Sequence, residues 1–386
     1  MPRATPRPKS MPDELASALK KARLDYSLPA RLDSIVTAAI ADHASPGAAI
    51  AVGRNGRLAY LRGYGSMDWN AGASADVDAG TLYDVASLTK VIATTTVAMM
   101  LEESGQLDLD LTVASYLPEF NAPDKSAITV RQLLIHRGGL EPFAALFLNH
   151  RGRDAYLAQI NWRPLASVPG TNTVYSDWDM ILLQLVMERI MRKSLDALAD
   201  EMVFRPLGMS DTRFTPPAAL LSRIAPTEID TLRGGLVRGF VHDENAWAMG
   251  GVAGHAGLFS TARDLSLFAQ MMLDGGELNG VRILRRATIE RWTARQGPES
   301  SRGLGWDTPA SGSSAGSFFS PRSFGHTGFT GTSIWIDPGK KLFLVLLTNR
   351  VNPTRNNMKI GPLRRAVADA IQQAALGAPL LNHESG

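Results

Sequence analysis

The pattern Ser-x-x-Lys occurs twice in the sequence, at Ser17 and Lys20 and at Ser87 and Lys90. A serine attacks a carbonyl carbon only when a base takes its proton, and a lysine one helical turn further on can do so if burial keeps its amine neutral. Ser17 lies in a polar, basic segment, where Lys20 is expected to be solvated and charged. Ser87 opens a strongly apolar segment, whose helix would also direct backbone N–H groups toward a developing oxyanion. The context therefore predicts a nucleophile at Ser87 with Lys90 as its base.

A second chemical group is Tyr175-Ser176-Asp177, which follows a loop containing Pro169 and Gly170. A tyrosine beside a cation can carry a proton between a nucleophile and a leaving group. The structural alternative is that Ser176 or Asp177 caps the apolar helix that follows. Both interpretations can hold at once.

A third segment, Gly325-His326-Thr327-Gly328-Phe329, has the character of a strand. Its small residues would let a substrate backbone lie against the edge of a sheet. A lone histidine in such a strand more often has a structural role. The three segments together are a far more specific indication of an active site than any one of them alone.

Two other groups carry reactive residue types without a matching context. Gly312–Gly316 has the Gly-x-Ser-x-Gly pattern around Ser314, but it lies in a Ser- and Gly-rich loop with no helix after it. His242–Asn245 and the later His255 have the residue types of a metal site, but their spacing fits no ligand motif. We therefore expect no metal ion and no cofactor, and expect these side chains to fix loop backbone.

The composition excludes several classes of protein. The chain has 386 residues, of which 45% are hydrophobic and 20% charged, as is typical of a globular protein with a substantial core. Forty basic and 37 acidic residues leave a formal charge of +3, too small to imply nucleic-acid binding. The absence of cysteine rules out a thiol nucleophile, a disulfide framework and a thiolate metal site. We expect a small-molecule substrate as the partner; the sequence carries no signal of oligomeric state.

No apolar run approaches the roughly 18 to 20 residues that span a bilayer, so no membrane insertion is expected. The basic N-terminus is not followed by the apolar segment of a signal peptide. As written, the sequence predicts a cytoplasmic protein; a chain with its export signal removed would be periplasmic or secreted.

The elements that must position these residues indicate an α/β fold of the α+β type. Asn55 and Gly56 lie between two apolar runs and predict a hairpin from Gly47 onward. Strand character returns at 325–328, 332–336 and 342–348, so the sheet is expected to be split between both ends of the chain. Helical periodicity covers most of the rest, at 13–23, 86–104, 129–136, 177–192, 194–203, 262–273, 285–295 and 362–376.

The simplest organisation is an α/β domain interrupted by a large helical domain. We expect an N-terminal extension over 1–28, an α/β domain formed by 29–85 and 300–386, and a helical domain over 86–299.

Taken in order, the three segments at Ser87, Tyr175 and His326 resemble the active-site motifs of the penicillin-recognising serine hydrolases. This superfamily includes class C β-lactamases, D-alanyl-D-alanine carboxypeptidases and family VIII esterases. The resemblance covers about residues 30 to 375, and Pro206–Met209 and Leu347–Arg350 are similar to further signatures of the β-lactamase-related branch. It implies a β-lactamase-like fold, with an antiparallel sheet flanked by helices and a helical domain inserted.

The resemblance also implies roles for individual residues. Ser87 would be the acylated nucleophile, Lys90 its hydrogen-bonded base and Tyr175 the relay of the proton to the leaving group. The backbone N–H groups of Ser87 and Phe329 would form the oxyanion hole. A further set would bind substrate, namely Asp177, His326, Thr327, Gly328, Asn352 and Arg355.

Departures from the family pattern bear on the substrate. His326 stands where β-lactamases usually have a lysine, so the permanent cation that faces a β-lactam carboxylate is missing. Asp177 stands where asparagine is usual, and an ionised carboxylate cannot donate to a substrate amide. Asn352 and Arg355 resemble an Asn-Pro-x-Arg segment that helps class C β-lactamases hold a carboxylate; the alternative is a solvated loop.

The predicted function is a metal-free serine hydrolase that acts through an acyl-enzyme on a small ester. Within the same chemistry, the alternative is a D-amino-acid peptidase or carboxypeptidase, or a weak class C-like β-lactamase. A hypothesis of another class is a penicillin-binding sensor or pseudo-enzyme that is acylated without turnover. A binding module that keeps only the fold is a third.

Overall fold

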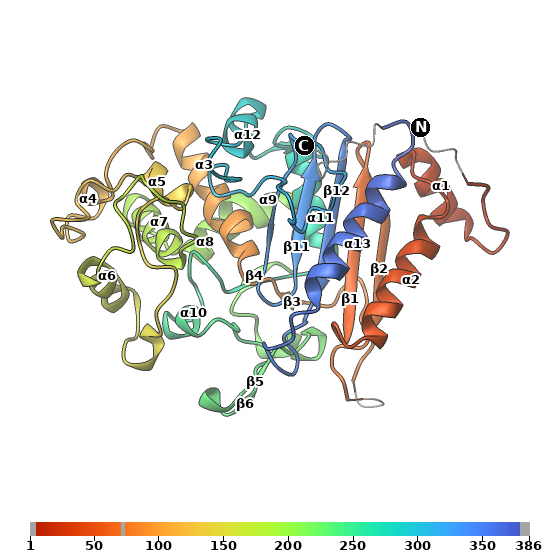
Figure 1. The fold of residues 1–386 in the computed structure, drawn as a ribbon, viewed down its shortest axis with the longest axis horizontal. Helices are drawn as coiled ribbons and strands as arrows, with labels where there is room; N and C mark the ends of the chain where they lie inside the picture. Colours follow the sequence, from red (N-terminus) through yellow and green to blue (C-terminus); the bar gives the residue numbers. More distant parts are fainter. Residues whose placement is uncertain (1–4, 71–73, 379–386) are drawn as a thin grey trace.

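The computed structural model describes residues 5–70 and 74–378, and its centre is a five-stranded antiparallel sheet (Figure 1). Strand β1 from the N-terminal part of the chain pairs with β12 from the C-terminal part, with Ala48 opposite Thr348 and Arg54 opposite Leu342. The predicted split sheet is therefore confirmed. Its order is β10-β11-β12-β1-β2, formed by Phe324–Thr327, Ser333–Asp337, Leu342–Thr348, Gly47–Arg54 and Arg57–Gly65.

The hairpin between β1 and β2 turns at the predicted dipeptide. Asn55 and Gly56 have φ angles of +55° and +75°. Two successive residues with positive φ are what a two-residue hairpin loop needs to match the twist of its strands.

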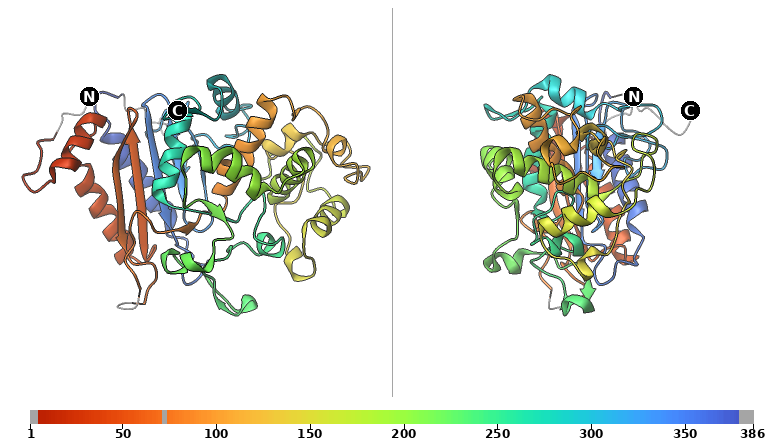
Figure 2. Two further views of the ribbon diagram at one scale, coloured as in Figure 1. Left: turned by 180° about the vertical axis from the view of Figure 1, so that it is seen from behind. Right: turned by 90° about the vertical axis from the view of Figure 1, so that its left-hand side faces the viewer.

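Helices cover both faces of the sheet. Alternate residues of each strand point to opposite faces, so Ile50 and Leu344 pack in one core while Ala51 and Val345 pack in the other. The first core is closed by α1 (Asp13–Ala22), α2 (Leu28–Ala41) and α13 (Ile360–Gln373). The opposite face is covered by α11 (Ala262–Leu273), seen in front of the sheet in the left view of Figure 2.

Three of these helices bear on the expectations from sequence. No helix was predicted at α2. Helix α1 lies within the segment expected to be an extension, yet it packs into the core of the sheet, and α11 lies within the segment expected to be helical domain, yet it covers the sheet. The domain boundaries themselves remain a prediction.

The remaining elements form a mainly helical region beside the sheet (Figure 1). Its longest helix, α7 (Asp177–Met191), is buried along most of its length, as the apolar pattern predicts. The other helices are α3 (Thr96–Glu103), α4 (Val113–Tyr116), α5 (Val130–Leu134), α6 (Arg153–Trp162), α8 (Leu195–Ala199), α9 (Arg205–Leu207), α10 (Glu244–Ala248) and α12 (Arg286–Thr293). π-Helical turns precede α3 and α9, and short 3-10 turns lie at Leu146–Leu148, Ala218–Arg223 and Thr231–Arg233.

Short strands complete the described chain. A three-stranded sheet joins β3 (Tyr83–Asp84), β7 (Leu258–Ser260) and β4 (Arg213–Phe214). Since β3 ends three residues before Ser87, this small sheet positions the predicted nucleophile. Two-stranded pairs are formed by β5 (Ile229–Asp230) with β6 (Gly235–Leu236) and by β8 (Glu277–Leu278) with β9 (Val281–Arg282). Within the described residues, no helix has both the length and the apolarity needed to cross a membrane.

Candidate active site

Ser87 lies at a sharp turn between β3 and the helix that follows it. Ala86 has a φ of +48°, a conformation that costs a residue with a side chain roughly 1 to 2 kcal/mol. The carboxylate of Asp84 stabilises this turn by accepting a hydrogen bond of 2.8 Å from the backbone N–H of Ala86. The strained turn leaves Ser87 only partly buried while its neighbours in sequence are buried.

Lys90 is fully buried, and its ammonium group has three hydrogen-bond partners. Nζ lies 3.0 Å from Ser87 Oγ, 2.8 Å from Asp177 Oδ1 and 3.1 Å from the backbone carbonyl of His255. An ammonium group has three hydrogens, so each has one acceptor. The structure thus brings Ser87, Lys90 and Asp177 into one cluster.

The charge of Lys90 differs from the expectation of a neutral base. Burial is the largest single influence and lowers the pKa of Lys90, but the carboxylate of Asp177 and the side chain of Tyr175 together outweigh burial and raise the pKa to about 12. The expectation that burial keeps the amine neutral is therefore wrong, because the opposing charge comes from a residue far away in the sequence. A charged ammonium group has no lone pair with which to take the proton of Ser87, so in this state Lys90 could only stabilise negative charge on Oγ.

The ring of Tyr175 is enclosed by two cations and two histidines. Lys90 Nζ lies 4.8 Å and Arg302 Cζ 5.1 Å from the ring centroid. The rings of His136 and His326 lie 4.6 Å and 5.8 Å away, centroid to centroid. Two positive charges therefore lie against the residue that the sequence predicts to carry a proton.

Both histidines are buried and close to Arg302. His326 Nδ1 lies 2.9 Å from the carbonyl of Thr327, and its Nε2 has no hydrogen-bond partner among the described residues. Burial, with the charges of Arg302 and Lys90, holds the pKa of His326 well below its usual range. His326 is therefore neutral at pH 7 and does not replace the cation that the family pattern has at this position.

His136 forms a buried pair with Asp179 at 2.9 Å. Burial holds the pKa of His136 well below and that of Asp179 well above the usual range, so burial disfavours the ionised form of both groups. The sequence predicts only that His136 caps or orients a turn, and it predicts no role for Asp179 or Arg302. His136 and Asp179 are 43 residues apart, and no local pattern marks Arg302, so these contacts have no signal in the sequence.

Thr327 ends β10, and the loop that follows it, with Gly328 and Phe329, packs against the turn before Ser87. Thr330 Oγ1 donates to the carbonyl of Asp84 at 2.7 Å, and Thr332 Oγ1 donates to that of Val85 at 2.9 Å. A Cβ at Gly328 would lie 2.4 Å from the carbonyl oxygen of Val85, so this approach needs glycine.

Two backbone donors at this junction are unused. The N–H groups of Ser87 and Phe329 donate to no group in residues 5–70 and 74–378. Unpaired N–H groups beside a nucleophile are what an oxyanion hole requires.

Three of the predicted substrate-binding residues have protein partners instead. Asp177 pairs with Lys90, as described. Asn352 is buried and its side chain donates to the carbonyl of Thr227 at 2.9 Å. Arg355 donates to two carboxylates at 2.6 Å, those of Glu228 and Glu244, so it is not a free cation for a substrate carboxylate.

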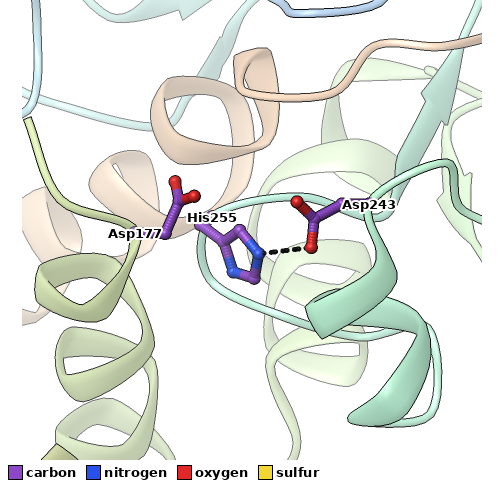
Figure 3. A group of neighbouring side chains, drawn as sticks. All are labelled: Asp177, Asp243 and His255. Atoms are coloured by element: carbon purple, nitrogen blue, oxygen red, sulfur yellow. Dashed lines mark hydrogen bonds and ion pairs between the residues drawn. The ribbon is translucent and has the colours of Figure 1, made fainter. Parts of the chain in front are cut away.

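A group of possible metal ligands lies beside Lys90. One ligand atom each from Asp177, Asp243 and His255 lies within 4.8 Å of the others (Figure 3). Asp243 also caps α10 through the N–H of Ala246, as expected for a side chain that fixes loop backbone, and His255 Nε2 lies 2.8 Å from its carboxylate. The ammonium group of Lys90 already supplies positive charge to the two carboxylates, which disfavours a second cation there.

The apparent hydrolase pattern around Ser314 is not part of this cluster. Ser314 Oγ accepts a hydrogen bond of 3.0 Å from the indole N–H of Trp335, and no helix follows it. Its surroundings support a structural role.

A helical region packed on an antiparallel sheet, with a serine and a buried lysine where the two meet, is the arrangement of a serine hydrolase. Residues 32–369 match the model of the Beta-lactamase family, and the chain belongs to that family. The chain is 35% identical over 303 residues to an Escherichia coli (strain K12) protein named "Putative D-alanyl-D-alanine carboxypeptidase", covering 70% of this chain and 69% of the relative.

Two solved structures share the fold. A class C beta-lactamase has a TM-score of 0.74 and 20% identity, covering 92% of this chain and 98% of its own. EstCE1, described as a hydrolase with promiscuous acyltransferase activity, has a TM-score of 0.72 and 21% identity, covering 90% of this chain and 98% of its own. The predicted fold and enzyme class are therefore confirmed.

Proposed function

We propose that this protein hydrolyses small carboxylic esters through an acyl-enzyme at Ser87. The observation that carries the proposal is the 3.0 Å contact between Ser87 Oγ and the buried, charged Nζ of Lys90. The unused N–H groups of Ser87 and Phe329 support it, because they are free to bind a developing oxyanion.

The proposed cycle has two halves. Tyr175 enters the cycle as a phenolate: Ser87 Oγ attacks the ester carbonyl while its proton passes to the phenolate oxygen, and the charged Lys90 stabilises the negative charge. The tetrahedral oxyanion accepts hydrogen bonds from the two N–H groups. Its collapse breaks the C–O bond to the alcohol, which leaves with the proton from Tyr175. Water then attacks the acyl group, gives one proton back to Ser87 and releases the acid.

The state of Asp177 favours an ester over an amide. An asparagine at this position could donate to a substrate amide, whereas Asp177 is an acceptor whose carboxylate is bound to Lys90 at 2.8 Å. The side chain therefore offers a substrate no amide donor.

The test is hydrolysis of p-nitrophenyl butyrate, with the burst and the steady state recorded and the acylated residue located by mass spectrometry. Turnover with a butyryl group on Ser87 is the expected result. A burst of about one equivalent without turnover identifies an acylated sensor instead. Turnover with no adduct on Ser87, under conditions that trap an acyl-enzyme, overturns the proposal.

A second candidate is cleavage of substrates that carry a carboxylate, such as peptides ending in a D-amino acid. The guanidinium group of Arg302 makes no hydrogen bond or ion pair among the described residues, and its Nη1 is buried. It lies against the ring of Tyr175, and His326, whose Nε2 is also unpaired among the described residues, is another neighbour of that ring. A buried guanidinium nitrogen without an acceptor is costly, and a substrate carboxylate would satisfy it.

This candidate is tested by comparing an uncharged D-alanyl ester with its counterpart that ends in a free carboxylate. Arg302→Gln is expected to raise KM for the carboxylate substrate about 10- to 100-fold, the value of a hydrogen bond to a charged group. KM for the uncharged ester should stay within about twofold. Arg322→Gln, at a side chain that is largely exposed, is the control. Equal effects on both substrates would contradict carboxylate recognition.

A further inference from the structure

The peptide between Gly328 and Phe329 is held by an arginine from the C-terminal helix. Arg364 lies in α13, and its Nη2 lies 2.7 Å from the carbonyl oxygen of Gly328 and 2.7 Å from that of Thr332. Gly328 also donates its own N–H to Thr332 at 2.8 Å. One guanidinium nitrogen therefore closes the base of the loop that packs against Ser87.

The geometry of a peptide bond links this contact to the oxyanion hole. The carbonyl of Gly328 and the N–H of Phe329 belong to one planar trans peptide, so they point in opposite directions. A donor that holds the carbonyl on the α13 side therefore keeps the N–H pointing away from α13. That N–H has no partner among the described residues.

We propose that Arg364 is a positioning residue of the oxyanion hole, which orients and polarises the Phe329 N–H through the carbonyl of Gly328. The inference rests on the proposed function, because an oxyanion must form at Ser87 for this N–H to act on it. Arg364 does not touch the reacting atoms.

The charge of Arg364 is available for this role. Burial lowers the pKa of Arg364 to about 10, with a further contribution from nearby Arg350, so the side chain remains charged at neutral pH. A hydrogen bond from a charged donor is stronger than one from a neutral donor. Electron density drawn toward the carbonyl oxygen makes the N–H of the same peptide a better donor.

Arg350 lies close to the same loop but binds a different peptide group from the one that Arg364 binds. Arg350 Nε donates to the carbonyl of Phe329 at 2.9 Å, and this carbonyl belongs to the next peptide, whose N–H is that of Thr330. Arg350 thus supports the loop, whereas Arg364 holds the peptide that carries the unused donor. The carbonyl of Gly328 has one other donor, the Gly331 N–H at 3.0 Å, so the loop keeps one bond when Arg364 is replaced.

The test measures transition-state binding separately from substrate binding. Arg364→Gln and Arg364→Lys are compared with wild type, and Arg365→Gln, at the exposed next position of α13, is the control. The readouts are kcat and KM for p-nitrophenyl butyrate, the inhibition constant of butylboronic acid and the thermal midpoint. The tetrahedral adduct of the boronic acid with Ser87 places a boron-bound oxygen in the oxyanion hole.

Arg364→Gln is expected to lower kcat about 10- to 100-fold with KM within twofold, and to weaken boronate binding by a similar factor. Removing an oxyanion donor outright costs about 100- to 1,000-fold in kcat, and a misdirected donor should cost less. The kcat and the boronate affinity of Arg364→Lys should lie between those of wild type and those of Arg364→Gln. If Arg364→Gln does not fold, Arg364→Lys serves as the test variant in its place.

Two outcomes overturn the inference. If folded Arg364 variants keep kcat and boronate affinity within twofold of wild type, Arg364 does not position the donor. If only the thermal midpoint falls, its role is structural. A wild-type protein that neither hydrolyses the ester nor binds the boronate overturns the proposed function itself, which distinguishes the two failures.

Discussion

The two copies of Ser-x-x-Lys occupy opposite environments in the same molecule. In α1, Ser17 and Lys20 are both exposed, and no hydrogen bond joins their side chains in the described structure. At the start of the apolar helix, Lys90 is fully buried and its Nζ lies 3.0 Å from Ser87 Oγ. The spacing is identical, so the surroundings alone make the difference.

The cause of the difference is how each helix is buried. In α1 the buried residues are Ala16, Leu19 and Ala22, which form one face and leave Ser17 and Lys20 on the solvent side. Every residue from 88 to 99 is buried, so Lys90 has no solvent side to occupy. A buried ammonium group must find acceptors within the protein, and Ser87 and Asp177 are among those it finds. Burial of the whole helix, more than the motif, creates the reactive pair.

The largest difference between the two Ser-x-x-Lys motifs is expected in ester hydrolysis when each serine is replaced in turn. Ser87→Ala is expected to lower kcat/KM for p-nitrophenyl butyrate about 10⁴-fold or more, because a nucleophile is lost outright. Ser17→Ala, with the same change of atoms at an exposed site, should stay within twofold. Thermal midpoints that match wild type confirm that both variants fold. Substantial activity in Ser87→Ala would break the distinction between the two copies.

Replacing the two lysines should give a smaller contrast, visible in activity and in stability. Lys90→Met is expected to lower kcat about 10³-fold, and to reduce the free energy of unfolding by about 2–3 kcal/mol, because Asp177 is left without its cation. Lys20→Met should change the free energy of unfolding by less than about 0.5 kcal/mol. Urea unfolding at pH 7 and ester hydrolysis measure the two effects. A stable and active Lys90→Met would contradict the role of the buried charge.

Local patterns predicted much of the fold and of the cluster at Ser87. The turn at Asn55 and Gly56 and the apolar helix α7 follow from residues adjacent in sequence. Helix α2 was missed although Leu28, Leu32 and Val36 repeat every four residues. Its β-branched residues lower the helix propensity, and its stability comes from packing on the sheet.

The charges in the site could not be predicted in the same way. The pKa of Lys90 depends on Asp177, which is 87 residues away, and on whether the side chains that raise this pKa outweigh the burial that lowers it. Arg364 reaches Gly328 from 36 residues away. Such contacts are made by tertiary packing and have no spacing that marks them, whereas Ser87 and Lys90 are one helical turn apart.

The Asp177→Asn variant should show whether the charge or the neutral form of Lys90 supports activity. Asp177 and Tyr175 together raise the pKa of Lys90 to about 12, so wild type keeps the cation across the measurable alkaline range. Without the carboxylate, burial lowers the pKa of Lys90, so the cation is lost at a lower pH. We expect kcat to fall about tenfold at pH 8 and the alkaline limb of the pH profile to move down by at least one unit. Higher activity than wild type at neutral pH would instead support a neutral lysine base.

The smallest expected effect concerns the ion pairs around Arg355, which hold no nucleophile. Burial raises the pKa of Glu228, but His242 and Arg355 outweigh it and lower the pKa to about 2. The carboxylate therefore stabilises the fold above about pH 4.5, and this contribution is lost as the pH falls through about 2. After allowance for solvent screening it amounts to about 1–2 kcal/mol.

Glu228→Gln should consequently lower the urea midpoint at pH 7 and flatten its decline between pH 4.5 and 2, with ester hydrolysis within about threefold of wild type. An acid decline as steep as that of wild type would show that other carboxylates control it. Loss of hydrolysis with an intact fold would mean that the Arg355 cluster belongs to the active site, and that its ion pairs open when substrate binds.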